Sequence, residues 1–322
     1  ADMLMTDFTV LGFVDYNRDE NVIHLNEKLF NFLDAKLEKR DYDGLKIVSS
    51  VTDKPNAKMD LKSGALSVSG VSFVELSDSN QVSIFPYGGD LVVHQNRDFT
   101  FDGVVETGRF ALYGKTINFV YDSFELVFNN IDSLQYAVPS DLYDNTGLPI
   151  DWAVNTVISD LVGTLSIDAP NNKSGLKDYS EFPKLKSIKD SYIYYDNIKD
   201  GVYERDLFSF KVDPFQLDSL LIIDTYSLEF PGYLNTPSIF PLFPDTLTLD
   251  KDLELSFIHE IKNKYPVYQG KGFFTNKLIL NNSGLSGEGT IYYLNSITET
   301  DSVYFYPNQV LANANKYDIS KQ

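Results

Sequence analysis

Cysteine is absent from this sequence of 322 residues, tryptophan occurs once and histidine three times. Without cysteine the chain has no disulfide, no thiolate metal site and no cysteine nucleophile. The histidines, His24, His94 and His259, are far apart, and none has the HxH or HExxH spacing of a metal site. The sequence also has no GxSxG motif and no phosphate-binding glycine loop. We therefore expect no bound metal, no organic cofactor and no catalytic residue of these classes.

Basic residues are scarce relative to acidic ones, with 27 Lys and Arg against 46 Asp and Glu and a net charge of −19. Nucleic-acid binding needs a concentrated basic surface, so the charge argues against a nucleic-acid partner and also against an anionic membrane surface. No apolar run approaches the roughly 18 residues of a membrane-spanning helix. The chain begins ADMLMTDF, without an initiator methionine, so we expect a processed chain or a section of a longer one.

Phenylalanine and tyrosine are abundant, with 23 and 21 copies, and many of them alternate with polar residues. The alternation is clearest over 96–138, where glycine, asparagine and aspartate interrupt it too often for helices. Alternation places successive side chains on opposite faces of a strand, so we expect Phe124, Leu126 and Phe128 to face a core. We expect the same of Phe119 unless a slip or bulge at 122–123 exchanges the two faces. The pattern predicts a mainly β fold, either a β-solenoid or a multi-sheet β array with short helical inserts.

Four segments carry more specific predictions. Residues 6–15 read as a first strand, and 26–40 as a helix with one apolar stripe and Asn26 as its cap. A second short helix is predicted over 151–161. Prolines cluster over 231–266, and because proline removes a donor from a strand ladder, this segment is predicted to be edge, loop or cover.

The chain divides into three predicted parts. Residues 1–140 form a β-rich module with one early helix, 141–178 a connector with a short helix, and 179–322 a second β-rich module with the proline-rich segment. Both modules repeat an order of strand, polar turn, strand and proline-terminated aromatic strand, as in SIFP at 83–86 and YFYP at 304–307. This order favours a degenerate internal repeat.

Several phrases resemble known proteins. NAKMDLKSGALSVSGVSFVELSDSNQVSIFP (56–86), NRDFTFDGVVETGRFALYGK (96–115) and LILNNSGLSGEGTIYYL (278–294) resemble segments of large, repeat-rich cell-envelope proteins of Gram-negative bacteria. The last phrase is also similar to the β-repeat units of AsmA- and TamB-type periplasmic proteins. The resemblance implies one section of a larger extracytoplasmic molecule, periplasmic or outer-membrane-associated, whose partners are other envelope proteins or glycans. The two predicted helices and the proline-rich segment depart from a TamB-type array.

Two groups of side chains offer enzymatic chemistry, and each has a simpler interpretation. A polysaccharide-degrading parallel β-helix enzyme would need clustered carboxylates with a basic residue beside them. The one comparable cluster is Arg97, Asp98, Asp102, Glu106, Arg109 and Lys115. Such a cluster also arises on the solvent face of ordinary strands, which is polar. Asp15, Asn17 and Asp19 have the first spacings of a calcium loop, but Glu20 and Asn26 replace its required Gly and Glu, which favours a solvated turn.

Tyrosines provide the candidate ligand-binding residues. Exposed aromatic rings stack on the apolar faces of sugars, and such a platform is predicted at Tyr192, Tyr194, Tyr195 and Tyr203. Tyr292, Tyr293, Tyr304 and Tyr306 form a second group. Alternate tyrosines on a strand are also common at the rim of a core, where the hydroxyl is hydrogen-bonded.

The sequence as a whole favours a non-enzymatic structural or interaction module of a bacterial cell-envelope protein. The alternatives are a polysaccharide-degrading β-helix enzyme and a carbohydrate-binding module. An enzyme needs convergent carboxylates in a cleft, whereas a scaffold does not, and this difference separates the first alternative from the module.

Overall fold

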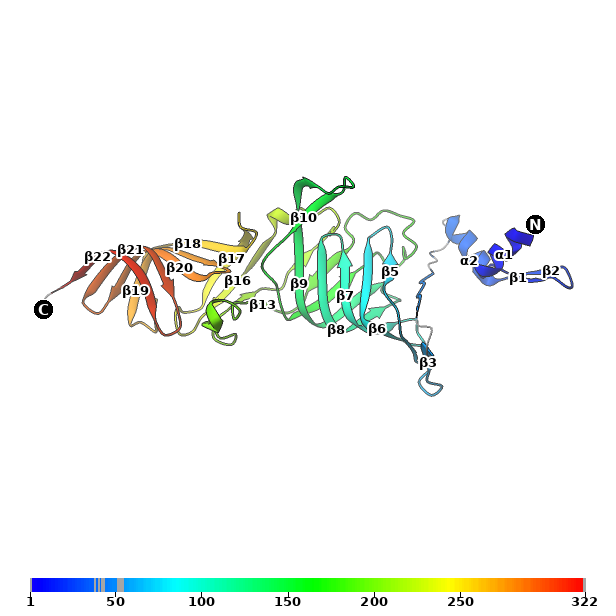
Figure 1. Ribbon diagram of the computed structural model, residues 1–322, viewed down its shortest axis with the longest axis horizontal. Coiled ribbons are helices and arrows are strands. Elements are labelled where there is room, and N and C mark those ends of the chain that lie inside the picture. Colours follow the sequence, from blue (N-terminus) through cyan, green and yellow to red (C-terminus); the bar gives the residue numbers. More distant parts are fainter. Residues whose placement is uncertain (1, 38, 40, 42–43, 51–54, 321–322) are drawn as a thin grey trace.

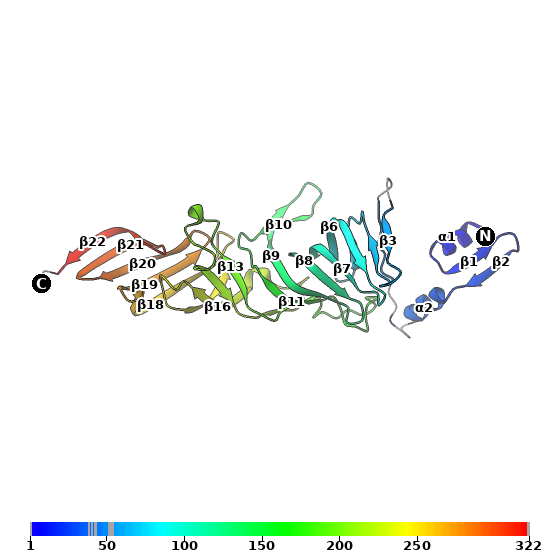
Figure 2. The same cartoon turned by 90° about the horizontal axis from the view of Figure 1, so that it is seen from below.

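The computed structural model describes residues 2–37, 39, 41, 44–50 and 55–320. It is mainly β, with 54% strand and 7% helix, as the sequence predicts. The elements follow one another along the long axis, with the N-terminal helices at one end and the last strands at the other (Figures 1 and 2). Every strand pair in the described part of the chain is antiparallel. The fold there is a multi-sheet array, and no solenoid is seen in it.

The N-terminal unit holds two helices and a hairpin: α1 (Asp2–Val10), β1 (Val14–Asn17), β2 (Val22–Leu25) and α2 (Glu27–Lys36). The strand predicted over 6–15 is wrong for its first half, which belongs to α1. Helix formation brings the Phe8 ring to 6.3 Å from Phe13, which in turn lies 5.2 Å from Phe32. These contacts between separate segments override a local alternation that is too short to specify a strand.

Helix α2 confirms the early helix, and the predicted end at 38–40 lies partly outside the described residues. Asn26 occupies the cap position, but its side chain donates to the Gly12 carbonyl at 3.3 Å instead of capping α2. The predicted apolar stripe is present and faces solvent at Phe30, Leu33 and Leu37, while Ala35 is the buried residue of the helix.

The first large sheet contains eleven strands in the described part of the chain, in the order β15-β12-β11-β9-β8-β7-β6-β4-β3, with β10 attached to β9 and β5 to β6. Its central strands form a long meander that curls into a half-barrel (Figure 1). The strands are β3 (Ala57–Met59), β4 (Leu66–Val68), β5 (Val74–Ser77), β6 (Val82–Val93), β7 (Phe99–Thr107), β8 (Phe110–Val120), β9 (Glu125–Tyr143), β10 (Pro149–Ala153), β11 (Leu161–Ser166), β12 (Lys184–Ser187) and β15 (Gln216–Leu217).

The predicted core residues of the meander are confirmed. Phe124, Leu126 and Phe128 are all buried, and so is Phe119. Alternation along β7 and β8 follows the same rule, with inner residues buried and outer ones half-buried or exposed. One sheet face therefore supplies the core, as a half-buried antiparallel strand requires.

The second large sheet contains nine strands in the described residues, in the order β13-β14-β16-β17-β18-β19-β20-β21-β22. They are β13 (Ser191–Tyr194), β14 (Ser209–Val212), β16 (Glu229–Asn235), β17 (Phe243–Leu249), β18 (Leu255–Val267), β19 (Gly272–Asn281), β20 (Gly284–Tyr293), β21 (Ser296–Phe305) and β22 (Val310–Ile319). Short 3-10 turns, η1 (Lys199–Gly201) and η2 (Thr225–Ser227), lie between them. The chain passes back and forth between the sheets over 184–235, and one buried cluster extends through both.

The helix predicted over 151–161 is wrong. Strand β10 includes residues up to Ala153, Ile158 bridges to Leu134, and β11 begins at Leu161. The buried positions Val154, Thr156 and Ile158 recur every second residue. Two residues four apart, such as Val154 and Ile158, share a face both in a helix and in an extended chain. Val154, Thr156 and Ile158 are β-branched, and β-branched residues favour the extended chain. The module boundaries near 140 and 178 stay predictions.

The proline-rich segment is also corrected, because β16, β17 and β18 are interior strands of the second sheet. Pro231, Pro244 and Pro266 lie in these strands, whereas Pro237 and Pro241 lie between β16 and β17, as loop. Pro231 pairs with Thr246, and on the β14 side it lies just beyond the ladder, which starts at Gly232, where its carbonyl accepts the Asp213 N–H at 2.9 Å. Pro244 pairs with β16, while the β17–β18 ladder covers only 248–249 and 255–256. The missing donor therefore breaks no ladder in these strands.

Candidate functional site

The predicted tyrosine platform divides into an outer and an inner pair. Tyr192 and Tyr194 lie two apart on β13, and their rings stack with centroids 5.8 Å apart and an interplanar angle of 10°. Both are half-buried, whereas Tyr195 is 2% exposed and Tyr203 0% exposed. The structure thus brings Tyr192 and Tyr194 together at the surface and places the other two rings in the core. Ligand binding by the four residues stays a prediction.

Charged side chains surround Tyr194. Its hydroxyl donates to the Asp160 carboxylate at 2.5 Å, and the Arg205 guanidinium lies 4.2 Å from its ring centroid. Burial, followed by the hydrogen bond to Asp160, raises the pKa of the Tyr194 hydroxyl above its usual range. Arg205 is itself bonded through Nε to Asp196 at 2.8 Å. Tyr194 is therefore a neutral, oriented ring held by an acid and a guanidinium.

A pocket of about 440 Å³ lies beside this arrangement, where the two large sheets meet. Tyr195 and Asp196 both line it, and each has a buried oxygen, Oη and Oδ1 respectively, with no hydrogen-bond partner among the described residues. Burial raises the pKa of the Tyr195 hydroxyl, which therefore keeps its proton. The remaining lining is largely amide and hydroxyl groups: Gln135, Asn155, Thr156, Ser159, Asn197 and Asn282.

Amide groups of the pocket wall also join the two sheets through hydrogen bonds. Asn155 N–H donates to the Leu253 carbonyl at 2.7 Å, and its own carbonyl accepts from Asn282 Nδ2 at 3.1 Å. Thr156 Oγ1 donates to Asn282 Oδ1 at 3.0 Å. A buried donor and acceptor in a polar, preformed cavity can bind water or a hydroxylated ligand such as a sugar.

Tyr203 has a different role. Its hydroxyl donates to the Phe305 carbonyl at 2.8 Å and accepts from the Leu285 N–H at 3.3 Å. The ring lies so close to Gly284 that a Cβ there would be 2.6 Å from Tyr203 Cε2. Tyr203 therefore anchors β20 and β21, and glycine at 284 makes room for its ring.

The second tyrosine group is also dispersed. Tyr292 and Tyr293 are neighbours on β20, so their side chains point to opposite faces of the sheet. Tyr306 is 7% exposed, and Lys199 donates to its hydroxyl at 2.6 Å while lying 4.2 Å from the Tyr304 ring centroid.

The acid–base cluster of the meander makes four separate contacts in the described structure. Asp98 accepts the Tyr121 N–H at 2.8 Å, and Asp102 accepts the Thr116 N–H at 2.7 Å. The other two contacts are ion pairs at 3.2 Å between Arg97 and Asp122 and at 3.0 Å between Arg109 and Asp151. The two carboxylates hold the main chain of β8 and of the turn after it, which is a structural role.

Neither the histidines nor the calcium-like spacing forms a ligand set. His94 lies 3.1 Å from Thr100 and His259 2.9 Å from Asp245, while His24 lies on β2. Asn17 Oδ1 accepts the N–H groups of Asp19 and Glu20 in the β1–β2 turn. Within the described ranges, no group of three or more His, Cys, Asp and Glu side chains is placed to hold a metal.

Sequence reasoning missed most of the pocket wall. Gln135, Asn155 and Asn282 come from separate strands and turns, and no local pattern relates them. Asp196 directly follows the tyrosine run, in YYDN, and this adjacency was the available signal. No helix in the described part of the chain has the length and apolarity to cross a bilayer. Comparison of the chain with protein-family models, curated proteins and solved structures finds no match.

Proposed function

We propose that this chain is a non-enzymatic structural or interaction module of a bacterial cell-envelope protein. The observation that supports it is the use of the candidate carboxylates. Asp98 and Asp102, the acids that an enzyme of the β-helix class would need, are bonded to main-chain N–H groups of different segments. Each of these contacts gives the carboxylate a structural use that does not depend on catalysis, whereas acid–base catalysis on a glycosidic bond requires two carboxyl groups that face a common substrate position.

The cellular setting is part of the same proposal and rests on the sequence resemblance. In this proposal the module lies in the periplasm or at the outer membrane, within a larger polypeptide whose partners are envelope proteins or glycans. The antiparallel, multi-sheet architecture is compatible with this role. It also leaves strand edges at β3 and β22, each of which is one end of a large sheet in the described residues.

A panel of acidic and neutral polysaccharides, with and without calcium, tests the absence of catalysis. We expect no release of reducing ends by the parent chain. The matched control is the Asp98→Ala/Asp102→Ala double variant, checked for folding by circular dichroism. Calcium-dependent cleavage by the parent that disappears in a folded double variant would establish the polysaccharide-degrading alternative in its place.

A second function, carbohydrate binding, is favoured by the pocket between the sheets. Its support is the pair of unpartnered buried oxygens, Tyr195 Oη and Asp196 Oδ1, beside the stacked rings of Tyr192 and Tyr194. A sugar hydroxyl can accept from the phenol and donate to the carboxylate, while its ring carbons contact tyrosine.

Titration with neutral oligosaccharides of several linkages tests this second function. Tyr195→Phe should weaken binding about tenfold, because it removes one hydrogen bond to the ligand. Tyr136→Phe is the matched control, since Tyr136 also carries a buried, unpartnered hydroxyl but does not line this pocket. Equal affinities of the parent and both variants would reject this site.

A further inference from the structure

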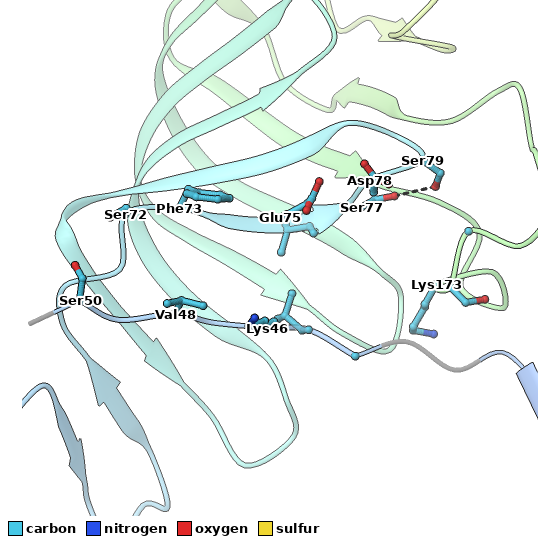
Figure 3. A pocket seen from close by; sticks show the side chains of 15 residues that line it. Lys46, Val48, Ser50, Ser72, Phe73, Glu75, Ser77, Asp78, Ser79 and Lys173 are labelled. Carbon is cyan, nitrogen blue, oxygen red and sulfur yellow. Dashed lines mark hydrogen bonds between the residues drawn. The ribbon is translucent and has the colours of Figure 1, made fainter. Parts of the chain in front are cut away.

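Strand β5 has one paired neighbour among the described residues, β6, and its other edge faces a pocket of about 750 Å³. The opposite wall of this pocket is the segment 44–50, which precedes the first sheet in sequence and runs alongside β5 (Figure 3). We call this space the β5 slot. It is lined by 44–46, 48, 50, 72, 73, 75–79 and 173–175.

Hydrogen bonds attach the segment wall to the rest of the protein near each end of the slot. At one end Ser49 bridges to Val71, and Ser50 N–H donates to the Gly70 carbonyl at 3.0 Å. At the other end the Asp41 carboxylate accepts the N–H groups of Lys173 and Ser174 at 2.8 and 2.9 Å. Between these ends no backbone hydrogen bond joins residues 45–48 to β5, both of which the structure describes.

Both walls of the slot have the alternation of strands. On the segment wall, Leu45 and Ile47 pack against the core while Lys46 and Val48 are exposed. On the β5 side, Val74 and Leu76 are buried while Phe73 and Glu75 are exposed. Two extended walls with matching inner and outer faces therefore flank the slot, and the β5 wall presents a free strand edge.

We propose that the β5 slot binds an extended peptide segment of a partner protein, which adds as a strand to the free edge of β5. The inference rests on the proposed interaction role and names the partner of this surface. A strand edge presents main-chain donors and acceptors in a row, and the chemistry that matches such a row is another peptide backbone. Sugar hydroxyls do not form a regular row of donors and acceptors with the spacing of a strand edge.

The side chains of the slot define the peptide further. Lys46 comes from the segment wall and Lys173 from the loop at one end of the slot, whereas Glu75 and Asp78 come from β5 and the turn after it, as Figure 3 shows. The slot thus has two basic and two acidic side chains, although the whole chain has a net charge of −19. Because its charges balance, the slot accommodates a neutral peptide and does not repel acidic partners as an acidic surface would. The exposed rim residues Phe73 and Val48 can pack on outward apolar side chains of the added strand.

A synthetic probe tests the proposal on the full chain. The probe is an alternating Thr-Val hexapeptide, blocked at both ends, with one benzoylphenylalanine in place of a central Val. A matched probe carries N-methyl groups at alternate residues, which remove the donors of one strand edge. We expect photo-cross-links within 44–50 and 72–79, and at least about tenfold weaker binding of the methylated probe.

Two variants accompany the probes. Phe73→Ser should weaken binding about tenfold, and because this ring is 54% exposed, the fold should be retained. Ile222→Ser, at a site 75% exposed and outside the slot, should bind as the parent does. Equal binding of the methylated probe, cross-links at another edge such as β22, or a Kd weaker than about 1 mM would overturn the proposal. Polysaccharide turnover would instead reject the proposed non-enzymatic role. Failure of the peptide-binding proposal and failure of the proposed function therefore give different results.

Discussion

Acidic side chains of this protein hold main chain in place at several separate points. Asp98 and Asp102 bond to N–H groups of β8 and the following turn, and Asp41 bonds to the loop at 173–174. Asp168 accepts from Asn80, Ala169 and Asn172, which joins the turn after β5 to the loop after β11. At the scale of residues, therefore, part of the large acidic excess has a structural role in turns and loops.

Leu126 and Glu125 separate core from surface on one strand. Leu126 is 0% exposed, whereas Glu125 is half-buried and bonded to its neighbour Ser123. Leu126→Ala should lower the free energy of unfolding by about 2–5 kcal/mol, through lost transfer energy and a cavity. Glu125→Ala should change it by less than about 0.5 kcal/mol. Urea unfolding of both variants measures the difference, and equal losses would mean that both faces of β9 are buried.

Asp168 should make stability depend on pH. Burial raises its pKa in the folded state, although hydrogen bonds from Asn172, Ala169 and Asn80 oppose the shift. Because the folded pKa is raised, the stabilising contribution is full below the unfolded value near 3.8 and is lost as pH rises through the folded pKa. The stability of the parent relative to Asp168→Asn should therefore increase on going from about pH 7 to about pH 4.

Urea midpoints of the parent and Asp168→Asn at both pH values provide the measurement. The other carboxylates titrate in both proteins and cancel in the difference. A relative stability that falls with decreasing pH would show that the hydrogen bonds, and not burial, dominate at Asp168.

At the scale of elements, close strand approach depends on particular small residues. Gly163 on β11 pairs with Ser187 on β12, and a Cβ at 163 would lie 1.9 Å from the Lys186 carbonyl oxygen. That oxygen belongs to the main chain, so the two strands would have to separate.

Gly163→Ala should therefore destabilise the protein by about 1–3 kcal/mol or more, through overpacking. Gly44→Ala is the control, since a Cβ there meets none of the described residues within 4 Å and φ is not in the left-handed region. Thermal unfolding of both variants makes the comparison. An unchanged midpoint for Gly163→Ala would mean that β11 and β12 separate at little cost.

At the scale of the whole molecule, two large sheets share one core although few main-chain bonds join the halves of the second sheet. The β17–β18 ladder has two residue pairs. Aromatic contacts reinforce it, because Phe257 lies 6.3 Å from Phe210 and 6.0 Å from Phe243, ring centroid to centroid. Strands β12 and β15 of the first sheet also alternate in sequence with strands of the second.

This arrangement predicts one cooperative unfolding transition for both large sheets. The single tryptophan, Trp152 on β10, reports on the first sheet, and hydrogen exchange of β19–β21 reports on the second. The two probes should give coincident denaturant midpoints, as two-state unfolding requires. Phe257→Ala should lower both midpoints together. An earlier loss of protection in β19–β21 would show that the second sheet opens separately at the β17–β18 ladder.

The amino-acid sequence by itself determined the class of the fold, the burial of Phe124, Leu126 and Phe128, and the helix that begins at Glu27. Each of these follows from a period of two or of 3.6 residues, and a short window of sequence contains the whole period. The spacing of two between Tyr192 and Tyr194 is also local, and it places both rings on one face of β13, whereas ligand binding by the four predicted tyrosines stays a prediction.

Only the tertiary structure decided which strands are neighbours and what lies between them. It made strands of 149–153 and 161–166 with a non-helical link at Val154 between them, where a spacing of four fits both periods, and it placed prolines in interior strands. It also brought Asp196, Asn155 and Asn282 to one pocket, and set segment 44–50 beside β5 without joining them. Strand neighbours are selected by contacts between distant segments, and a local pattern carries no information about which segment will supply the other side.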